Sequence, residues 1–284
     1  MPSRSLSITQ LRRLRKAFLY IMLILFSIST LLPLFWMIST SLKSGDVIFE
    51  IPPRFWPDGF HWQNYTRAIE EINFFTLFKN TLIITGFQLL SNVFVSAFVA
   101  YGFARFEFPG KNIWFLLVLS TIMLPGEVTM IPVFIGFSEI GWVDSFKPLI
   151  IPGFFGGSPV FIFLLRQFFM SVPKELEESA IIDGANSFKI FYRIFLPLSV
   201  PALMVIGIFS FQGSWNDLLG PLIYLNSTDK FTLTLGLAMF RGLMKVEWGP
   251  LMAGSIMALV PVIVVFFAAQ KHFVEGVKLT GIKG

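Results

Sequence analysis

The chain has 284 residues and a formal net charge of +5, with 55% hydrophobic but only 14% charged residues and a mean hydropathy of +0.73. Soluble domains carry about 25% charged residues, so this composition indicates a membrane protein. The basic residues lie beside apolar segments and form no single face, which argues against a nucleic-acid partner. The absence of cysteine excludes disulfides, and the widely separated His61 and His272 predict no metal site.

Apolar stretches recur along the chain, and a helix needs about 20 such residues to cross the hydrocarbon core of a membrane. Six stretches qualify, which predicts an all-α, polytopic protein with six transmembrane helices. Pro125-Gly126-Glu127 interrupts the third stretch and Asp217 lies near the far end of the fifth, so we expect these two spans to be broken or partly interfacial. The stretches are residues 17–40, 81–104, 113–137, 149–170, 198–224 and 252–270.

Basic residues set the expected orientation. The leader, residues 1–16, ends directly before the first span and carries Arg4, Arg12, Arg13, Arg15 and Lys16. Because positive charge is retained on the cytoplasmic side, we expect the N-terminus in the cytoplasm, and six spans return the C-terminus to the same side. Residues 41–80 then form an external segment, and residues 171–197 form a cytoplasmic loop.

This cytoplasmic loop is polar, with the sequence ELEESAIIDGANSFKIFYRIFLP over residues 175–197. Ser171 as an N-cap with Pro173 in the first turn predicts one short helix, and Gly184 offers the left-handed conformation that ends it. Ser187 can cap a second helix, whose aromatic residues recur at helical spacing. Periodicity alone leaves two alternatives open: a connector lying in the membrane interface, or a helical plug for a cytoplasmic partner. The aromatic residues are Phe188, Phe191, Tyr192 and Phe195.

The same loop resembles the EAA loop of the permease subunits of bacterial ATP-binding-cassette importers. That pattern is Glu-Ala-Ala, three residues, Gly, nine residues, an aliphatic residue, one residue and Leu-Pro. Here it reads Glu178-Ser179-Ala180, Gly184, Ile194 and Leu196-Pro197. Ser179 departs from the usual Ala by a small-for-small change.

Three further segments resemble the carbohydrate branch of this family, specifically its shorter maltose-type permease. PPRFWPDGFHWQNY, residues 52–65, is similar to an external segment rich in proline and aromatic residues. SWNDLLGPLIYLN, residues 214–226, is similar to a Trp-Asn-acidic stretch in the fifth span, and the tail GVKLTGIKG is also typical of the branch. The resemblance therefore extends over nearly the whole chain.

The resemblance implies a single transmembrane permease domain over residues 1–284 with the type I importer fold, located in the bacterial cytoplasmic membrane. It implies half of the translocation pathway of an ATP-driven importer of mono-, di- or oligosaccharides that works by alternating access. The implied partners are a second, related permease in a heterodimer, two cytoplasmic ATPase subunits and an external solute-binding protein, besides membrane lipid. We expect no cofactor on this chain: no G-x-x-x-x-G-K-[ST] occurs, so ATP and Mg²⁺ would bind to the ATPase subunits and the chain itself would not be an enzyme.

The resemblance also implies roles for individual residues. Trp215, Asn216 and Asp217 combine an aromatic face with hydrogen-bonding groups, as sugar sites do, although polar groups between membrane helices equally bond to a partner permease. The resemblance implies that the cytoplasmic loop, residues 171–197, is the coupling element and would dock in a groove of the ATPase. Its coupling residues would be Glu177, Glu178, Ser179, Ala180, Asp183, Gly184, Ala185, Phe188, Phe191 and Pro197.

Other functions remain as alternatives. An ion-gradient-driven secondary transporter would show two repeated halves with intramembrane acids, and no convincing internal repeat is visible. An importer for a non-sugar solute fits the same motifs. An intramembrane enzyme lacks support, because no paired catalytic carboxylates, HExxH or GxSxG occur. For the remaining charged residues within spans, we expect Glu127 to be solvated at the interface and Arg166 to snorkel.

Overall fold

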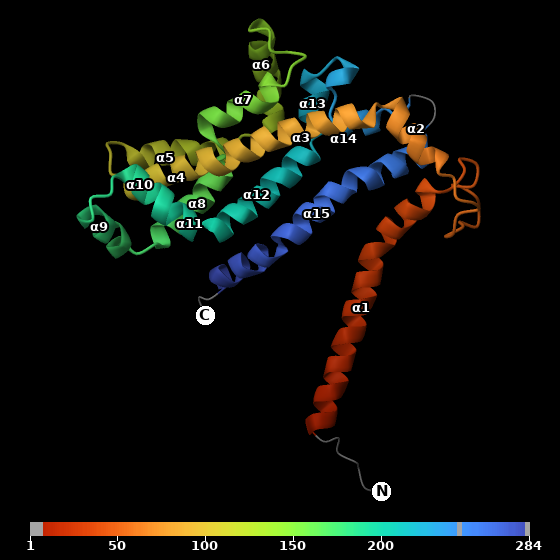
Figure 1. Ribbon diagram of the computed structural model, residues 1–284, viewed down its shortest axis with the longest axis horizontal. Helices are drawn as coiled ribbons and strands as arrows, with labels where there is room; N and C mark the ends of the chain where they lie inside the picture. The colour runs from red at the N-terminus through yellow and green to blue at the C-terminus, as the bar shows by residue number, and fades with distance from the viewer. Residues whose placement is uncertain (1–7, 243–245, 282–284) are drawn as a thin grey trace. The chain divides into compact units, whose positions relative to one another are not determined.

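The computed structural model describes residues 8–242 and 246–281, which form helices and, apart from an isolated bridge between Arg241 and Val246, no strand (Figure 1). The chain divides into two compact units, Met1–Glu70 with Phe240–Met257, and Glu71–Met239 with Ala258–Gly284. Three of the basic residues that the sequence suggests as topology signals, Arg4, Lys245 and Lys283, lie outside the described residues.

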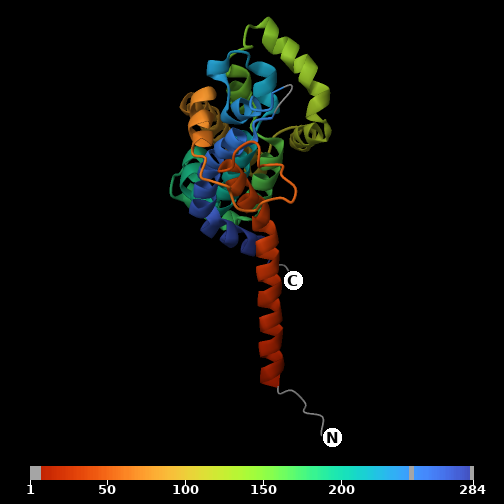
Figure 2. The same ribbon diagram turned by 90° about the vertical axis from the view of Figure 1, so that its right-hand side faces the viewer.

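The first unit holds α1 (Ile8–Ser41), nearly all of α2 (Gln63–Glu71) and the start of α15 (Trp248–Gly281). Figure 2 shows α1 as one continuous helix. Its large hydrophobic side chains between residues 18 and 32 are all at least half exposed. A helix that is apolar on every side is stable only in lipid or against other apolar elements. The predicted first span is therefore confirmed.

Polar bonds fasten the segment that the sequence predicts to be external, residues 41–80, to the end of α1. The Lys43 side chain is buried, donates to the carbonyl of Arg54 and lies 4.3 Å from the centre of the Trp36 ring. This burial lowers the pKa of Lys43. The amide of Asn64 donates to the carbonyls of Ser41 and Lys43, each at 2.9 Å. The segment is thus an ordered structure built on the C-terminal end of α1.

The second unit begins with a long span, Phe74–Arg105, built from α3 (Phe74–Leu90), the π-helix η1 (Ser91–Val95) and α4 (Ser96–Arg105). The span starts seven residues before the predicted position 81. The polar residues Lys79 and Asn80 interrupt the apolar stretch, so the sequence placed the start of the span after them. In the structure, Lys79 is exposed, and the amide of Asn80 donates to the carbonyls of residues 229 and 231 at 2.8 and 3.0 Å.

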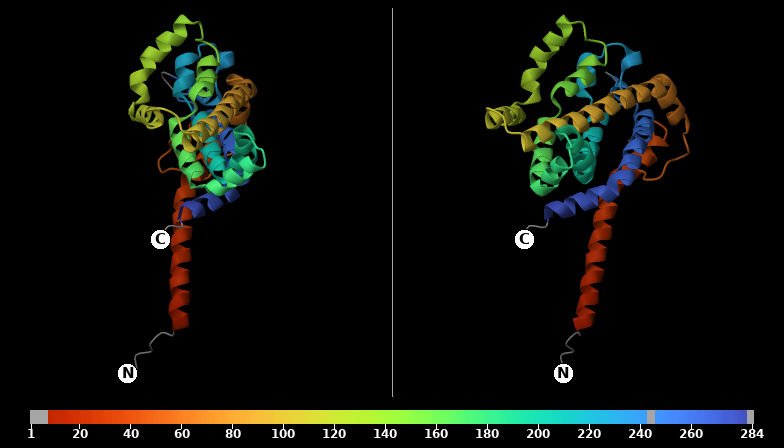
Figure 3. Two further views of the ribbon diagram at one scale, coloured as in Figure 1. Left: turned by 90° about the vertical axis from the view of Figure 1, so that its left-hand side faces the viewer. Right: turned by 60° about the vertical axis from the view of Figure 1, so that its left-hand side comes forward.

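The third span is broken, as predicted. Its first half is α5 (Lys111–Ser120) followed by the short 3₁₀ helix η2 (Thr121–Met123), and its second half is α6 (Gly126–Glu139). The halves meet at 100°, and the two panels of Figure 3 show this bend. Pro125 lies at the break, and Glu127 is exposed in the first turn of α6, where a negative charge favours the positive end of the helix.

The fourth span, Lys147–Ser171, consists of α7 (Lys147–Gly156) and α8 (Pro159–Ser171). The junction between them requires glycine: Gly157 has a φ of +67°, and a Cβ there would lie 2.6 Å from the hydroxyl of Ser96. That hydroxyl accepts a hydrogen bond from the Ser158 amide at 3.0 Å. The start of α8 therefore approaches α4 closely.

The fifth predicted span, 198–224, ends earlier than expected as a continuous helix. Its main helix is α12 (Val200–Trp215), and α13 (Leu219–Tyr224) follows after a break at residues 216–218. Among the described residues, four helices or helix runs are long and apolar enough to cross a membrane, and there are up to six if each sharply bent pair counts as one span. The all-α polytopic prediction is confirmed. The remaining elements are η4 (Thr228–Lys230), α14 (Leu233–Ala238) and α15, whose span is Trp248–Gln270.

Candidate functional site

The polar loop between α8 and α12 forms two short helical segments around a turn, as its sequence predicts. The first is α9 (Lys174–Ile182). The second is a continuous helical run of α10 (Ser187–Ile190), the π-helix η3 (Phe191–Phe195) and α11 (Leu196–Leu198) (Figure 1). We refer to residues 171–197 as the coupling loop.

Gly184 makes the turn. Its φ is +76°, and the turn has the bonding pattern of a Schellman motif: the Gly184 amide donates to the carbonyl of Ile181 at 3.0 Å, and the Ala185 amide donates to the carbonyl of Ala180 at 2.9 Å. A Cβ on Gly184 would meet nothing within 4 Å. The need for glycine is therefore conformational and not steric, and the space around the turn is open.

Both predicted N-caps of the loop are wrong. Ser171 is the last residue of α8, and α9 begins only at Lys174, after Pro173. The cap of the second helix is Asn186, whose side-chain oxygen accepts a hydrogen bond from the Lys189 amide at 2.8 Å, and not Ser187. Asn186 and Ser187 are both good capping residues, and the sequence did not reveal which of the two is the N-cap and which is the first residue of the helix.

The inner face of the second helix packs on α4. Ile190, Phe191 and Phe195 are at most 7% exposed. The ring of Tyr101 lies 5.1 Å from that of Phe191 and 5.0 Å from that of Phe195, and its hydroxyl donates to the carbonyl of Ser187 at 3.3 Å. Phe191 thus anchors the loop within the chain.

Arg105, the last residue of α4, joins the loop to the spans. Its guanidinium donates to the carbonyls of Phe169 at 2.8 Å and Val172 at 2.5 Å, where α8 ends. It also lies 3.6 Å from the carboxylate of Glu177 in α9 and 4.7 Å from the centre of the Phe195 ring. One buried cation therefore connects α4, α8 and both halves of the coupling loop.

The outer side of the loop exposes apolar side chains among charged ones. We call it the exposed coupling face, and it consists of Leu176, Ile181, Ile182, Phe188 and Tyr192, which are 44–86% exposed. The predicted aromatic face is therefore divided, because Phe188 and Tyr192 point outward whereas Phe191 points inward. The predicted coupling residues Glu178, Ser179, Asp183 and Pro197 are also exposed, and Ala180 and Ala185 are half-buried.

Sequence reasoning missed four residues of this site. From the sequence, Arg105 is only one of the basic residues beside the apolar segments, although an arginine at the last turn of an apolar helix is also placed to bind the carbonyls that end a neighbouring helix. Tyr101 gave no signal, because aromatic residues are common throughout the spans. Ile181 and Ile182 are adjacent apolar residues directly before Asp183-Gly184, which is a detectable sign of an exposed apolar tip.

The predicted substrate-path residues have separate environments. Trp215 is 3% exposed, its indole donates to the carbonyl of Ala258 at 3.1 Å, and it packs on neighbouring rings; it lies in the core in this structure, and its role in the substrate path stays a prediction. Asp217 is half-buried and accepts a hydrogen bond from the Gly220 amide at 3.1 Å, which holds the break before α13. Asn216 is exposed.

Arg166 lies within α8, and its Nε donates to the carbonyl of Phe103 at 3.2 Å. Its guanidinium lies 4.2 Å from the centre of the Phe115 ring. Both contacts belong to packing within the chain. The snorkelling of Arg166 that the sequence suggests stays a prediction.

Comparison with known proteins agrees with this architecture. Residues 92–279 match the family model described as "Binding-protein-dependent transport system inner membrane component". The arabinooligosaccharides transport system permease protein AraQ of Bacillus subtilis (strain 168) is 35% identical over 261 residues, which cover 91% of this chain and 92% of AraQ. The trehalose/maltose transport system permease protein MalG of Thermococcus litoralis is 30% identical over 275 residues, which cover 95% of this chain and 98% of MalG.

A solved structure has the same fold. It is a chain of a bacterial ABC transporter involved in the import of the acidic polysaccharide alginate, and it superposes with a TM-score of 0.81. The two sequences are 24% identical, and the match covers 96% of this chain and 100% of that one. The apolar spans, the coupling loop and these likenesses lead to one conclusion: the chain is a multi-pass membrane protein and belongs to the family of binding-protein-dependent transport system inner membrane components, the permease subunits of ABC importers.

Proposed function

We propose that the chain is the membrane-spanning subunit of an ATP-driven importer of sugars, with oligosaccharides as the substrate class. The substrate class is supported by the relatives, because AraQ and MalG are described as permeases for arabinooligosaccharides and for trehalose and maltose. The chain would form half of the translocation pathway beside a second, related permease. An external solute-binding protein would deliver the sugar.

The coupling loop carries the proposal of ATP-driven movement. Its outer face presents exposed apolar side chains, as a helix that docks in a groove of another protein does. Its inner face is held by Tyr101 and by the buried Arg105. A loop held in this way would transmit a push from a cytoplasmic ATPase to α4 and α8 as a rigid-body movement.

The other partners and the orientation follow from the same proposal. Two ATPase subunits would bind ATP and Mg²⁺, and this chain would bind no cofactor. Both termini and the coupling loop would lie in the cytoplasm, in accordance with the basic leader. On the external side, Phe55, Trp56 and Trp62 are more than half exposed and offer a surface for the solute-binding protein.

Within the chain, Asn216 is the candidate for contact with the sugar along the pathway. It is exposed beside the break between α12 and α13, and because its amide already donates to the carbonyl of Gln212 at 2.9 Å, one further donor and the acceptor oxygen are available to hydroxyl groups. Asp217 would support this position through its bond to the start of α13.

The test is transport by the purified complex in proteoliposomes. The chain, the permease and ATPase that co-purify with it, and its solute-binding protein are reconstituted with ATP inside the vesicles and a panel of labelled oligosaccharides outside. We expect sugar accumulation that requires both ATP and the binding protein. Uptake by this chain alone, driven by an ion gradient, would contradict the proposal, and ATP-dependent uptake of a non-sugar solute only would contradict the substrate class.

A further inference from the structure

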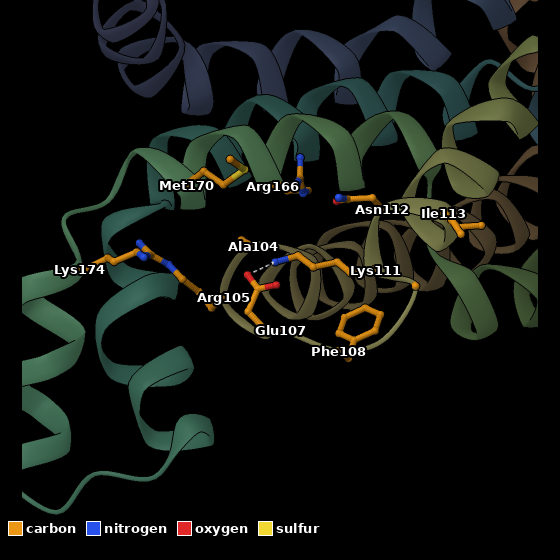
Figure 4. A pocket seen from close by; sticks show the side chains of 11 residues that line it. Ala104, Arg105, Glu107, Phe108, Lys111, Asn112, Ile113, Arg166, Met170 and Lys174 are labelled. Carbon is orange, nitrogen blue, oxygen red and sulfur yellow. Dashed lines mark hydrogen bonds and ion pairs between the residues drawn. The ribbon is translucent and has the colours of Figure 1, made fainter.

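A basic pocket lies beside the coupling loop in the second unit. It has a volume of about 650 Å³ and is lined by the end of α4, the first turn of α5, α8 and the start of α9 (Figure 4). Its lining includes four cations and a single carboxylate, which is an unusual concentration in a chain with 14% charged residues. The cations are Arg105, Lys111, Arg166 and Lys174, and the carboxylate belongs to Glu107.

Two of these cations keep donors for a ligand. Arg166 engages Nε with the carbonyl of Phe103, and its other donors have no acceptor among the described residues. The side chain of Lys111 is 12% exposed and donates to Glu107 at 3.0 Å, as Figure 4 shows. The side chain of Glu107 is 89% exposed, so this acid is free to turn into solvent when an anion takes its place.

Arg105 adds a buried donor without a partner. Its side chain is 5% exposed, and its Nε is buried without an acceptor among the described residues, whereas its terminal nitrogens bind the end of α8. Arg105 therefore adds a fixed, buried positive charge to the wall of the pocket, which favours an anionic ligand.

The first turn of α5 supplies a second kind of donor. Gly110 precedes this helix with a φ of +76° and no side chain caps it, while Gly110, Lys111 and Asn112 all line the pocket. The first N–H groups of a helix have no acceptors within the helix, and together with the helix dipole they favour a phosphate group. The Lys111 amide donates to the carbonyl of Phe108 at 3.2 Å, so the amides of Asn112 and Ile113 are the backbone donors that remain beside the cations of the pocket.

We propose that this pocket binds the phosphate group of an anionic phospholipid. The apolar surface next to it favours a lipid over free phosphate: Ile113 lines the pocket, and Ile113, Trp114, Leu116 and Leu117 along α5 are 52–66% exposed. These side chains would contact the acyl chains, and a basic pocket at the cytoplasmic boundary is where anionic headgroups bind. Only the choice of the cytoplasmic leaflet rests on the proposed orientation of the importer.

The test is lipid retention by the intact importer complex, measured by native mass spectrometry after purification in detergent. The variants are Lys111→Gln and Lys111→Gln with Arg166→Gln. Lys189→Gln is the control, because it removes the same charge from an exposed site in the coupling loop outside the pocket. Since a charge-assisted hydrogen bond contributes a factor of about 10 or more to binding, we expect roughly tenfold less bound phosphatidylglycerol for Lys111→Gln and still less for the double variant.

Equal retention by Lys111→Gln and the Lys189→Gln control would overturn the site. A second measurement identifies the source of the phosphate: short-chain phosphatidylglycerol should raise the unfolding temperature of the complex, whereas inorganic phosphate and glycerol phosphate should not. Equal stabilisation by the soluble phosphates would overturn the assignment to lipid. If the complex imports sugar but Lys111→Gln and Lys189→Gln retain equal amounts of lipid, only this inference is overturned. If lipid is lost selectively from Lys111→Gln but the complex does not import sugar, only the proposed function is overturned.

Discussion

The guanidinium of Arg105 and the carboxylate of Glu177 lie 3.6 Å apart and join the end of α4 to the first helix of the coupling loop. Arg105 is 5% and Glu177 is 21% exposed in their side chains. The neighbouring Glu178 is exposed on the surface of the same helix. The two adjacent acids therefore differ in role: Glu177 holds the loop to α4, and Glu178 faces outward.

Glu177→Gln and Glu178→Gln should separate these duties. Glu177→Gln removes the charge that pairs with Arg105, so we expect it to destabilise the chain by about 1–3 kcal/mol. Glu178→Gln should leave stability unchanged and weaken association with the ATPase. Thermal unfolding of the complex and ATPase co-purification measure the two effects. Equal loss of stability in both variants would show that the pair with Arg105 has no special role.

Gly184→Asp should insert into the membrane but lose sugar-stimulated ATP hydrolysis. The left-handed conformation costs an L-residue about 1–2 kcal/mol, and the added charge would stand in the open space around the turn. Gly184→Asn is the matched control, because asparagine tolerates positive φ and adds no charge. Normal stimulated hydrolysis by the Asp variant would contradict the coupling role of this loop.

Phe188→Ala and Phe191→Ala should have opposite signatures. Phe191 is 7% exposed and packs against Tyr101, so its truncation should cost about 3–5 kcal/mol of stability. Phe188 is 68% exposed, so its truncation should spare stability and reduce ATPase binding. The readouts are the unfolding midpoint of the purified complex and the amount of ATPase retained. A stable Phe191→Ala complex would refute the anchoring role.

Trp215→Phe and Asn216→Ala test the assignment of the pathway. Trp215→Phe removes the bond to the Ala258 carbonyl and should lower stability by about 1 kcal/mol, with sugar uptake retained in the folded complex. Asn216→Ala should leave stability unchanged and reduce the rate of uptake at subsaturating sugar. Uptake assays at several sugar concentrations separate the two variants. A selective loss of sugar uptake in Trp215→Phe would restore a direct role for the indole.

Asp144 should make the contact between the loop before α7 and residues 226–230 sensitive to acid. It accepts hydrogen bonds from Lys230 and from the amides of Asn226 and Ser227, and these bonds, with that of Lys230 first, hold its pKa well below the usual range. Because the folded pKa is lower than the unfolded one, the stabilisation is complete above the unfolded value of about 4 and decreases as pH falls below it.

The matched variant is Asp144→Asn, since asparagine also tolerates the φ of +58° found at this position. At neutral pH, its unfolding midpoint should lie below that of the unmodified chain. The difference should shrink on acidification through and below about pH 4. If the difference in unfolding midpoint does not change with pH, the carboxylate charge of Asp144 is not what stabilises its contact with residues 226–230.

The sequence by itself determined the protein class, the approximate positions of the spans and the two short helices around a turn in residues 171–197. These features depend on composition, on the length of apolar runs and on local turn chemistry, which are all readable along the chain: a φ of +76° at residue 184 favours glycine whatever surrounds it. The break of the third span at Pro125 was predictable for the same reason, because proline lacks the amide that would continue the helix.

Only the tertiary structure decided which side chains face inward. Phe188 and Phe191 are the same residue type in one short helical run, and the packing of Tyr101 from another span buries one and leaves the other exposed. Trp215 is a residue type that sugar sites use, yet its indole N–H donates a hydrogen bond to the carbonyl of Ala258 in α15. Arg105 binds Phe169, Val172 and Glu177, which are distant from it in sequence. Such contacts leave no local sequence pattern because they form only when separate helices pack together.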